Sequence, residues 1–281
     1  MQEVEFRDKF VAYLDVLGFK TFVEAAEAGA STNLNEARAV LKEYGSTERW
    51  SRRGMYCPES RYVQRDRDFR VLQVSDCIVA SSEISPAGVI NLVSYCSVVV
   101  FCLMNRGFMC RGYLTRGLVF HTDSDVVGSG YQRALENEKN VVAFRLEADE
   151  RGTPFVEVDK IVCDYVRQCG DECVKEMFSR FVKSDGESVA IFPFQSLAHS
   201  FIVAGRGIRF DADRERQSNE NVRAIVEIVK TRIMASVDMS NPSVAKKTSY
   251  YLQALDAQLA VCDRTEEMIT LLGEGGLGQG I

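Results

Sequence analysis

Two aspartates, Asp15 and Asp76, are the residues best placed to do chemistry. Asp15 follows the apolar run FVAYL, and Asp76 follows VLQVS. If both runs are neighbouring strands, the two carboxylates lie close together and repel each other unless one is protonated or a cation lies between them. Mg2+ is typically bound by one or two carboxylates, while water and substrate phosphates complete its shell. The pair therefore predicts a site for a divalent metal and a phosphorylated substrate.

The residues directly after Asp15 support this prediction. Leu17, Gly18 and Phe19 would begin a helix, whose free amides and positive dipole end favour phosphate oxygens. Glycine at position 18 lets the backbone approach a ligand closely. A purely structural alternative stays open, because Asp15 can cap that helix and Asp76 can be an ordinary turn residue.

Strands and helices alternate along the first half of the chain. The apolar run at residues 9–16 predicts a buried strand, and DFRVLQVSD with CIVASSE predicts a hairpin that turns at Ser75-Asp76. Through residue 140 the order reads β-α-α-β-β-α-β-β-α. This alternation indicates an α/β (α+β) fold with a mixed sheet, and it argues against an all-helical bundle or a sandwich.

The longest apolar run, Ala87 to Asn105, carries no charge. It is at the short limit for a membrane span, and polar residues interrupt it. Pro86 suits the first position of a helix. We expect a buried core or interface helix with no membrane insertion, and a membrane span is the alternative.

Composition limits the partners and the compartment. The net charge of −6 over 281 residues argues against a nucleic-acid partner. The charged N-terminus MQEVEFRDKF lacks the apolar segment of a signal peptide, and the nine cysteines include no Cys-x-x-Cys pair. These features favour a cytoplasmic location. We expect a catalytic core at 1–150, a completion of the sheet with added helices at 151–270, and a glycine-rich disordered tail at 271–281.

Four segments resemble the motifs of class III nucleotidyl cyclases. YLDVLGF resembles their first strand, VSDCIVA their metal-binding hairpin, RGYLTRG a later strand, and VVGSGYQRALENE the glycine turn and transition-state helix. Within the class, the likeness is closest to the bacterial anti-phage pyrimidine cyclases of Pycsar defence systems. It implies a cyclase-like, mainly antiparallel sheet flanked by helices, with extra C-terminal helices.

The resemblance also implies an activity. A homodimer would convert UTP or CTP into a 3′,5′-cyclic nucleotide and pyrophosphate, with uridylate favoured over cytidylate, and the product would signal to a separate effector protein. Two Mg2+ or Mn2+ ions would be held by Asp15, Val16 and Asp76. Bound metals of this kind activate an oxygen nucleophile and neutralise charge on the phosphates.

The substrate contacts depart from the family pattern. Leu17, Gly18 and Phe19 would face the phosphates, but the first base-reading position holds Leu72, which has no polar group. Arg70 lies two residues earlier on the same strand face and can donate to a base carbonyl, although an exposed arginine is the alternative. The second base-reading position falls at Asp125, which can accept from uracil N3–H, from the cytosine amino group or from the adenine amino group.

The transition-state positions are altered as well. The family asparagine falls at Gln132 and the family arginine at Glu136, whose carboxylate cannot stabilise negative charge. Arg133, Arg111 and Arg116 are candidates to replace that arginine, because a guanidinium pairs with phosphate oxygens and keeps its charge. The alternative is that one or two of them only form surface ion pairs. In the family the site forms between subunits, so Arg133 or Gln132 would act in trans.

Because the sequence departs from the family pattern at these positions, two further functions remain open. One is an adenylate or guanylate cyclase. The other is a catalytically inactive cyclase-like module that binds a nucleotide or mediates dimerisation.

Overall fold

The computed structural model describes residues 4–29, 33–51, 68–199 and 210–274. The chain divides into two compact units, Met1–Pro193 and Phe194–Ile281. The boundary expected at residue 150 falls inside the first unit, because the strand at Val156–Val158 joins the sheet of the preceding strands. Residues 271–274 of the expected tail belong to a helix, and residues 275–281 lie outside the described part.

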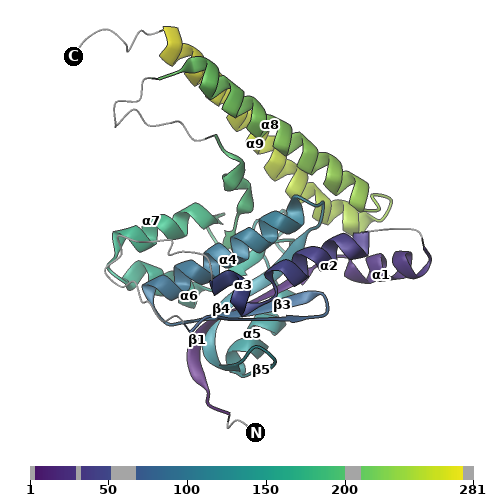
Figure 1. The fold of residues 1–281 in the computed structure, drawn as a ribbon, viewed down its shortest axis with the longest axis vertical. Coiled ribbons are helices and arrows are strands. Elements are labelled where there is room, and N and C mark those ends of the chain that lie inside the picture. The colour runs from purple at the N-terminus through teal and green to yellow at the C-terminus, as the bar shows by residue number, and fades with distance from the viewer. Residues whose placement is uncertain (1–3, 30–32, 52–67, 200–209, 275–281) are drawn as a thin grey trace. The chain divides into compact units, whose positions relative to one another are not determined.

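The first unit combines eight strands with helices in the order shown in Figure 1. The strands are β1 (Arg7–Val16), β2 (Arg70–Val74), β3 (Cys77–Glu83), β4 (Cys110–His121), β5 (Val126–Val127), β6 (Val156–Val158), β7 (Val182–Ser184) and β8 (Val189–Ile191). The helices are α1 (Phe19–Glu27), α2 (Asn33–Tyr44), α3 (Thr47–Ser51), α4 (Pro86–Met104), α5 (Ser129–Glu138), α6 (Lys160–Gln168) and α7 (Glu172–Phe181).

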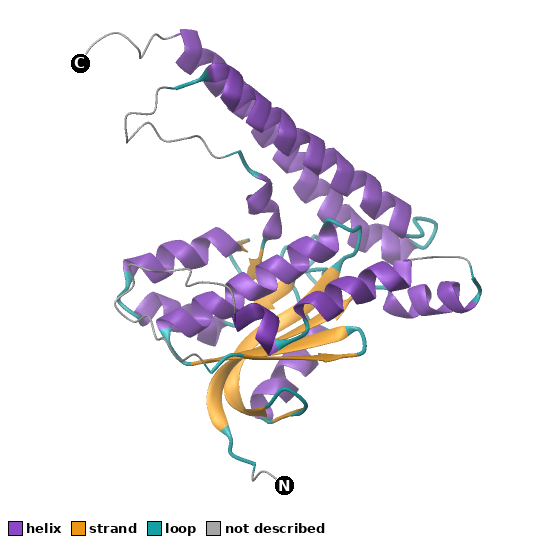
Figure 2. Cartoon of the chain, viewed as in Figure 1, coloured by secondary structure: helices purple, strands orange, loops and turns teal. Residues whose placement is uncertain are grey.

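The strands form one mixed sheet in the order β2-β3-β1-β4-β6-β8-β7, and β5 pairs with β4. The β4–β6 pair is parallel and the other pairs are antiparallel. Figure 2 shows helices on both faces of this sheet. The expected mixed, mainly antiparallel sheet flanked by helices is therefore confirmed.

Alternation along β1 separates the two faces of the sheet. Phe10, Leu14 and Val16 belong to the main core together with the apolar residues of α4. Val11 and Tyr13 point to the opposite face, where they pack with residues of β3, β4 and α5. Successive side chains of a strand point to opposite faces, so Asp15 shares the face of Val11 and Tyr13.

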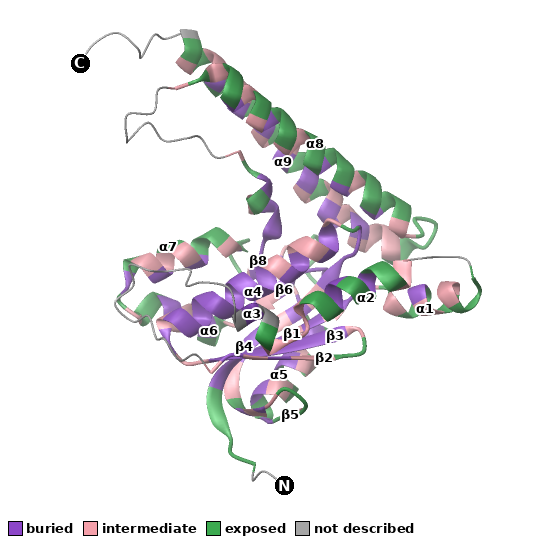
Figure 3. Ribbon diagram, in the orientation of Figure 1, coloured by how far each residue is buried: buried purple, intermediate pink, exposed green. Residues whose placement is uncertain are grey.

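Helix α4 is the central helix of the main core. Ser85 caps its N-terminus by accepting from the Gly88 amide at 2.9 Å, and Pro86 occupies its first turn. In the described part of the chain, α4 is the one helix long and apolar enough to cross a membrane, but 83% of that segment is buried inside the protein. Figure 3 shows α4 coloured mainly as buried. The expected core helix is confirmed.

The second unit begins within the 3₁₀ turn at Pro193–Leu197 and contains two long helices, α8 (Ala212–Ser236) and α9 (Pro242–Glu274). A buried stripe joins the two helices, and it includes Val226, Ile233 and Leu255. Ion pairs also connect them: Arg216–Glu266, Arg223–Asp263 and Lys230–Asp256.

Candidate active site

The fold brings Asp15 and Asp76 to the same corner of the sheet. Asp15 pairs with Cys77 across β1 and β3, and Asp76 directly precedes Cys77 in the turn of the β2–β3 hairpin. The Val16 amide donates to the Asp76 carbonyl at 3.3 Å. The hairpin turns tightly at Ser75-Asp76, with Ser75 at φ 55, because Val74 and Cys77 are paired. The predicted hairpin is confirmed, and its turn lies beside the end of β1.

The carboxylate of Asp15 is in an unusual electrostatic environment. Burial, followed by the charges of Glu138 and Asp76, raises its pKa from 3.8 to about 7, while Arg111 and Lys139 oppose this shift. Among the described residues, no hydrogen bond or ion pair reaches this carboxylate. A carboxylate that is partly buried and without a partner favours a cation beside it.

The helix-cap alternative for Asp15 does not agree with the geometry of α1. The N-cap residue of α1 is Gly18, at φ 78 and ψ 9, and no side chain caps the helix. Because Asp15 does not cap the helix, its carboxylate is free for another role. Asp76 does occupy a turn, as its structural alternative requires, and this position does not prevent a second role.

The residues after Asp15 differ in whether their backbone amides are already hydrogen-bonded. Leu17 donates its amide to the Met109 carbonyl at 3.0 Å, so this amide is not available to a ligand. In the described part of the chain, the amides of Gly18 and Phe19 have no acceptor. The expected three-residue phosphate seat is therefore corrected to the amides of Gly18 and Phe19, because Leu17 still hydrogen-bonds to a neighbouring segment.

Arg111 lies directly opposite Asp15 on β4, but its guanidinium is engaged elsewhere. Its Nε donates to the carboxylate of Glu138, and its Nη1 lies 3.5 Å from the Gly152 carbonyl. The side chains of Arg111 and Glu138 are only 14% and 3% exposed. Buried charges of this kind need a partner, so the pair is structural as well as electrostatic.

Glu138 was not identified from the sequence, yet it is a third carboxylate near the corner, and of the two whose charge raises the pKa of Asp15 it has the larger effect. Gly130, Ala134 and Glu138 are the buried positions of α5, and they recur every four residues. An acidic residue on the inward stripe of an amphipathic helix is the signal that identifies it.

Arg116 is on the opposite face of the sheet from Asp15. It pairs with Phe10, whose side chain belongs to the main core, whereas Asp15 shares the other face. Its Nε and Nη2 donate to Oδ2 of Asp8 at 2.9 and 2.7 Å. Arg116 is therefore removed from the group expected around Asp15, and it makes an ion pair at the surface.

Gln132 and Arg133 are exposed on the outer side of α5. The Nη1 atom of Arg133 donates to the Arg116 carbonyl at 3.0 Å. Since α5 turns Ala134 and Glu138 toward the sheet, neither exposed side chain faces Asp15 of the same chain.

The two residues expected to read the base also lie away from Asp15. Arg70 pairs with Ser81 across β2 and β3, and Ser81 pairs with Val11 across β3 and β1. Val11 lies four residues before Asp15, which is about 13 Å along the strand. Asp125 is exposed in the turn after β4, and its carbonyl accepts from the Thr122 amide at 2.8 Å. Along β4, His121 lies about 33 Å from Arg111, the partner of Asp15. One chain therefore does not bring these residues together with Asp15.

The donor chemistry of the corner suits Mg2+ or Mn2+. Across the described ranges, no cluster of three His, Cys, Asp or Glu side chains has the geometry to hold a metal ion. Asp15 and Asp76 supply two carboxylates, which is the number that Mg2+ commonly takes from protein when substrate phosphates and water complete its shell. The carboxylate of Asp15, which lacks a partner, is the observation that fits a cation.

No protein-family model and no curated protein matches the chain. Two solved structures resemble it at low identity. One is a class III adenylyl cyclase-like ATP-binding protein from Pseudomonas aeruginosa, with a TM-score of 0.35 and 12% identity over 57% of this chain. The chain spans about a third of that protein, 35% of its length. The other is the catalytic core of a rhodopsin-guanylyl cyclase with converted specificity in complex with ATPαS. Its TM-score is 0.36 and its identity 11%, over 68% of this chain and 98% of that one.

Proposed function

We propose that the chain is a metal-dependent nucleotidyl cyclase that converts UTP, or less readily CTP, into a 3′,5′-cyclic nucleotide and pyrophosphate. The observation that carries the proposal is the Asp15–Asp76 corner, in which one carboxylate lacks a partner and has its pKa raised to about 7. The YLDVLGF and VSDCIVA motifs supply the reaction class. The preference for a pyrimidine and the role in anti-phage signalling rest on the resemblance of these motifs.

Asp15 and Asp76 would hold the divalent ions, together with the backbone carbonyl of Val16. When bound, such ions lower the pKa of the ribose 3′-hydroxyl and neutralise charge on the triphosphate. The amides of Gly18 and Phe19, at the positive end of α1, would donate to phosphate oxygens.

The buried Arg111–Glu138 pair has a positioning role in this proposal. The positive charge of Arg111 lowers the pKa of Asp15 and so favours the ionised carboxylate that a cation needs. Glu138 keeps the guanidinium beside α5 and prevents it from closing onto Asp15. The acidic corner thereby remains open to a cation.

A second copy of the chain completes the proposed site. Arg133 and Gln132 are exposed on α5 and do not face Asp15 of their own chain. In a homodimer they would approach the partner's acidic corner and stabilise the charge that develops on the α-phosphate. Arg70 and Asp125 would likewise contact a nucleotide held by the second copy. The cyclic product would then act on a separate effector.

Two alternatives follow from specific observations. A purine cyclase is the alternative that Asp125 leaves open, because its carboxylate accepts from the adenine amino group as well as from a pyrimidine. An inactive nucleotide-binding module is favoured by the engagement of Arg111 with Glu138, which leaves the corner without a free guanidinium from the same chain.

The test is incubation of the purified protein with Mn2+ and each of the four NTPs, followed by mass spectrometry of the products. We expect cyclic UMP in the largest amount and its loss in Asp76→Asn. Asp8→Asn is the matched control, because Asp8 pairs with Arg116 on the opposite face of the sheet. Absence of every cyclic product overturns the proposal. A thermal shift with NTP and Mn2+ but no turnover then supports the inactive module, and a purine product supports the first alternative.

A further inference from the structure

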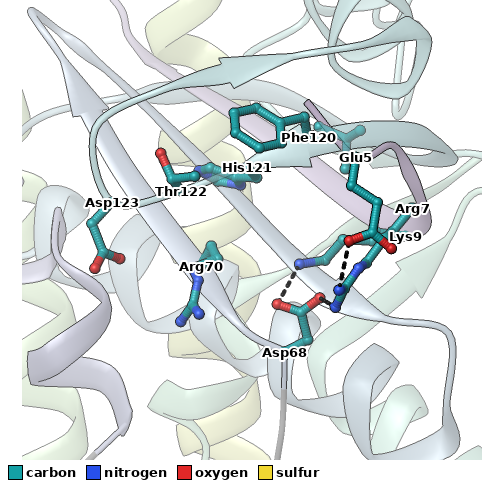
Figure 4. Close-up of a pocket in the computed structure, with 10 residues that line it drawn as sticks. Glu5, Arg7, Lys9, Asp68, Arg70, Phe120, His121, Thr122 and Asp123 are labelled. Atoms are coloured by element: carbon teal, nitrogen blue, oxygen red, sulfur yellow. Dashed lines mark hydrogen bonds and ion pairs between the residues drawn. The ribbon is translucent and has the colours of Figure 1, made fainter. Parts of the chain in front are cut away.

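A second polar site lies on the same face of the sheet as Asp15, at its other end. A pocket of about 340 Å³ is formed by the start of β1, by Arg70 at the start of β2 with Asp68 two residues before it, and by the end of β4. Lys9, Arg70 and His121 line this pocket from three different strands (Figure 4). None of the acidic residues Asp15, Asp76 and Glu138 lines it.

Lys9 forms the floor of this pocket. Its side chain is only 3% exposed, and its Nζ lies 3.0 Å from Oδ1 of Asp68. A buried ammonium needs a compensating partner, and Asp68 supplies it. Burial is the main cause that lowers the pKa of Lys9, and the charge of Arg70 lowers it further.

Among the described residues, Arg70 lines the pocket without an ion pair to an acidic side chain. Its one hydrogen bond within the described residues runs from Nη1 to the Phe69 carbonyl at 3.4 Å. Arg7, by contrast, is paired with Glu5 and Asp68. Most donors of the Arg70 guanidinium are therefore available, and this planar fork matches the oxygens of a phosphate or carboxylate.

His121 supplies a buried nitrogen that has no partner. The residue is 8% exposed, and its Nδ1 lies 2.8 Å from Oγ of Ser81. Its Nε2 has no hydrogen-bond partner in the described part of the chain, although it is buried. If Ser81 donates to Nδ1, the ring proton lies on Nε2, which then requires an acceptor.

The charges around His121 favour an anion. Burial, Lys9 and Arg70 lower its pKa to about 3, while Asp68 and Asp123 only partly oppose them. Of the acids that line the pocket, Glu5 and Asp68 are engaged with Arg7 and Lys9, and Asp123 is exposed at the rim. Among the described residues, this leaves one guanidinium without an ion pair and one buried nitrogen without an acceptor, and both residues adjoin Ser81, which pairs with Arg70 across β2 and β3 and contacts His121 Nδ1.

We propose that this pocket binds a small phosphate-type oxyanion, to which Arg70 and Nε2 of His121 donate hydrogen bonds. The site lies within one chain and needs no metal, and although it shares Arg70 with the base contact proposed above, it does not depend on the Asp15–Asp76 corner. The oxyanion can come from inorganic phosphate or from the phosphate of a nucleotide, and the experiment separates these two sources.

The test is isothermal titration of the full-length protein, without metal, with inorganic phosphate, UMP and uridine. We expect saturable binding of phosphate that sulfate competes away and that chloride at equal ionic strength does not. Arg70→Met weakens this binding by about tenfold or more, because a charge-assisted pair is lost. His121→Phe weakens it less, by about threefold to tenfold. UMP that binds far more tightly than phosphate identifies the nucleotide as the source.

Two control variants make the result specific. Arg106→Met removes an exposed arginine that does not line the pocket, and it leaves phosphate binding unchanged. Asp76→Asn removes the proposed metal site and also leaves it unchanged, so the two proposals fail independently. Two results overturn the proposal. One is that uridine binds in an Arg70-dependent way while phosphate does not bind. The other is that the wild type and Arg70→Met bind phosphate with equal affinity. If Arg70→Met does not fold, Arg70→Gln and His121→Gln replace it, and the same losses of phosphate affinity are expected.

Discussion

Asp15 lies directly opposite Arg111 across β1 and β4, yet Arg111 donates to Glu138 and not to Asp15. The guanidinium therefore affects Asp15 through its charge without occupying its oxygens. Burial and two neighbouring carboxylates raise the pKa of Asp15, and Arg111 limits the rise to about 7. This relationship leaves a carboxylate that a divalent cation can engage, and four predictions concern it and its surroundings.

The first prediction concerns the pH dependence of stability. The folded-state pKa of Asp15 is raised from 3.8 to about 7, so the folded protein binds a proton that the unfolded chain has released. Stability from this group is therefore lost as pH rises from about 4 to above 7. Asp15→Asn resembles the protonated form, so at pH 8 the variant should be more stable than the wild type by about 2–4 kcal/mol, where the upper figure is the unscreened shift of about three pKa units and the lower one allows for solvent screening.

The measurement is urea unfolding of both proteins, without metal, from pH 5 to pH 8. The difference in unfolding free energy should grow from pH 5 to about pH 7, level off above that pH, and shrink when Mn2+ is added to the wild type. A difference that does not vary with pH would exclude the raised pKa.

The second prediction concerns Glu138. Glu138→Gln leaves the buried Arg111 without its counter-charge and should lower the free energy of unfolding by about 3 kcal/mol. It should also lower the pKa of Asp15, because Glu138 is the largest charge that raises it. Glu136→Gln, two residues earlier on the exposed side of α5, is the control and should change stability by no more than about 0.5 kcal/mol. Equal effects in both variants, measured by urea unfolding, would contradict the structural role of the buried pair.

The third prediction separates the proposed phosphate seat from backbone strain. Gly18 and Gly29 flank α1 at φ 78 and 71, and a Cβ atom would clash with nothing at either position. Alanine at either site should therefore cost about 1 kcal/mol of stability through left-handed strain alone. Gly18→Ala should in addition raise KM for the NTP, because it disturbs the free amides, whereas Gly29→Ala should leave KM unchanged. An equal change in KM in both variants would exclude phosphate binding by the amides of Gly18 and Phe19.

The fourth prediction tests the shared site. Asp76→Asn and Arg133→Ala should each be inactive alone, and mixing equal amounts should restore about a quarter of wild-type activity, because half of the dimers then carry one intact site. Arg116→Met should stay active, since Arg116 lies on the other face of the sheet and pairs with Asp8. Activity of Arg133→Ala alone would remove that residue from the proposed mechanism.

Local patterns in the sequence predicted the elements that carry the acidic corner. The apolar run before Asp15 predicted the buried strand, the Ser75-Asp76 pair predicted the hairpin turn, and Pro86 predicted the start of the core helix. Such predictions succeed because alternation, turn residues and helix caps act over a few residues. The adjacency of Asp15 and Asp76 followed once their two strands were assumed to pair.

By itself, the sequence determined the strand ends, the hairpin and the acidic pair, because short-range propensities specify them. Tertiary structure alone decided the rest. The register of β4 on β1 placed Arg116 on one face and Arg111 on the other, since a shift of one residue would exchange them. The docking of α5 gave Arg111 its partner Glu138, and three strands distant in sequence gathered Lys9, Arg70 and His121 around one pocket. These relationships depend on contacts between residues far apart in the chain, which no local pattern records.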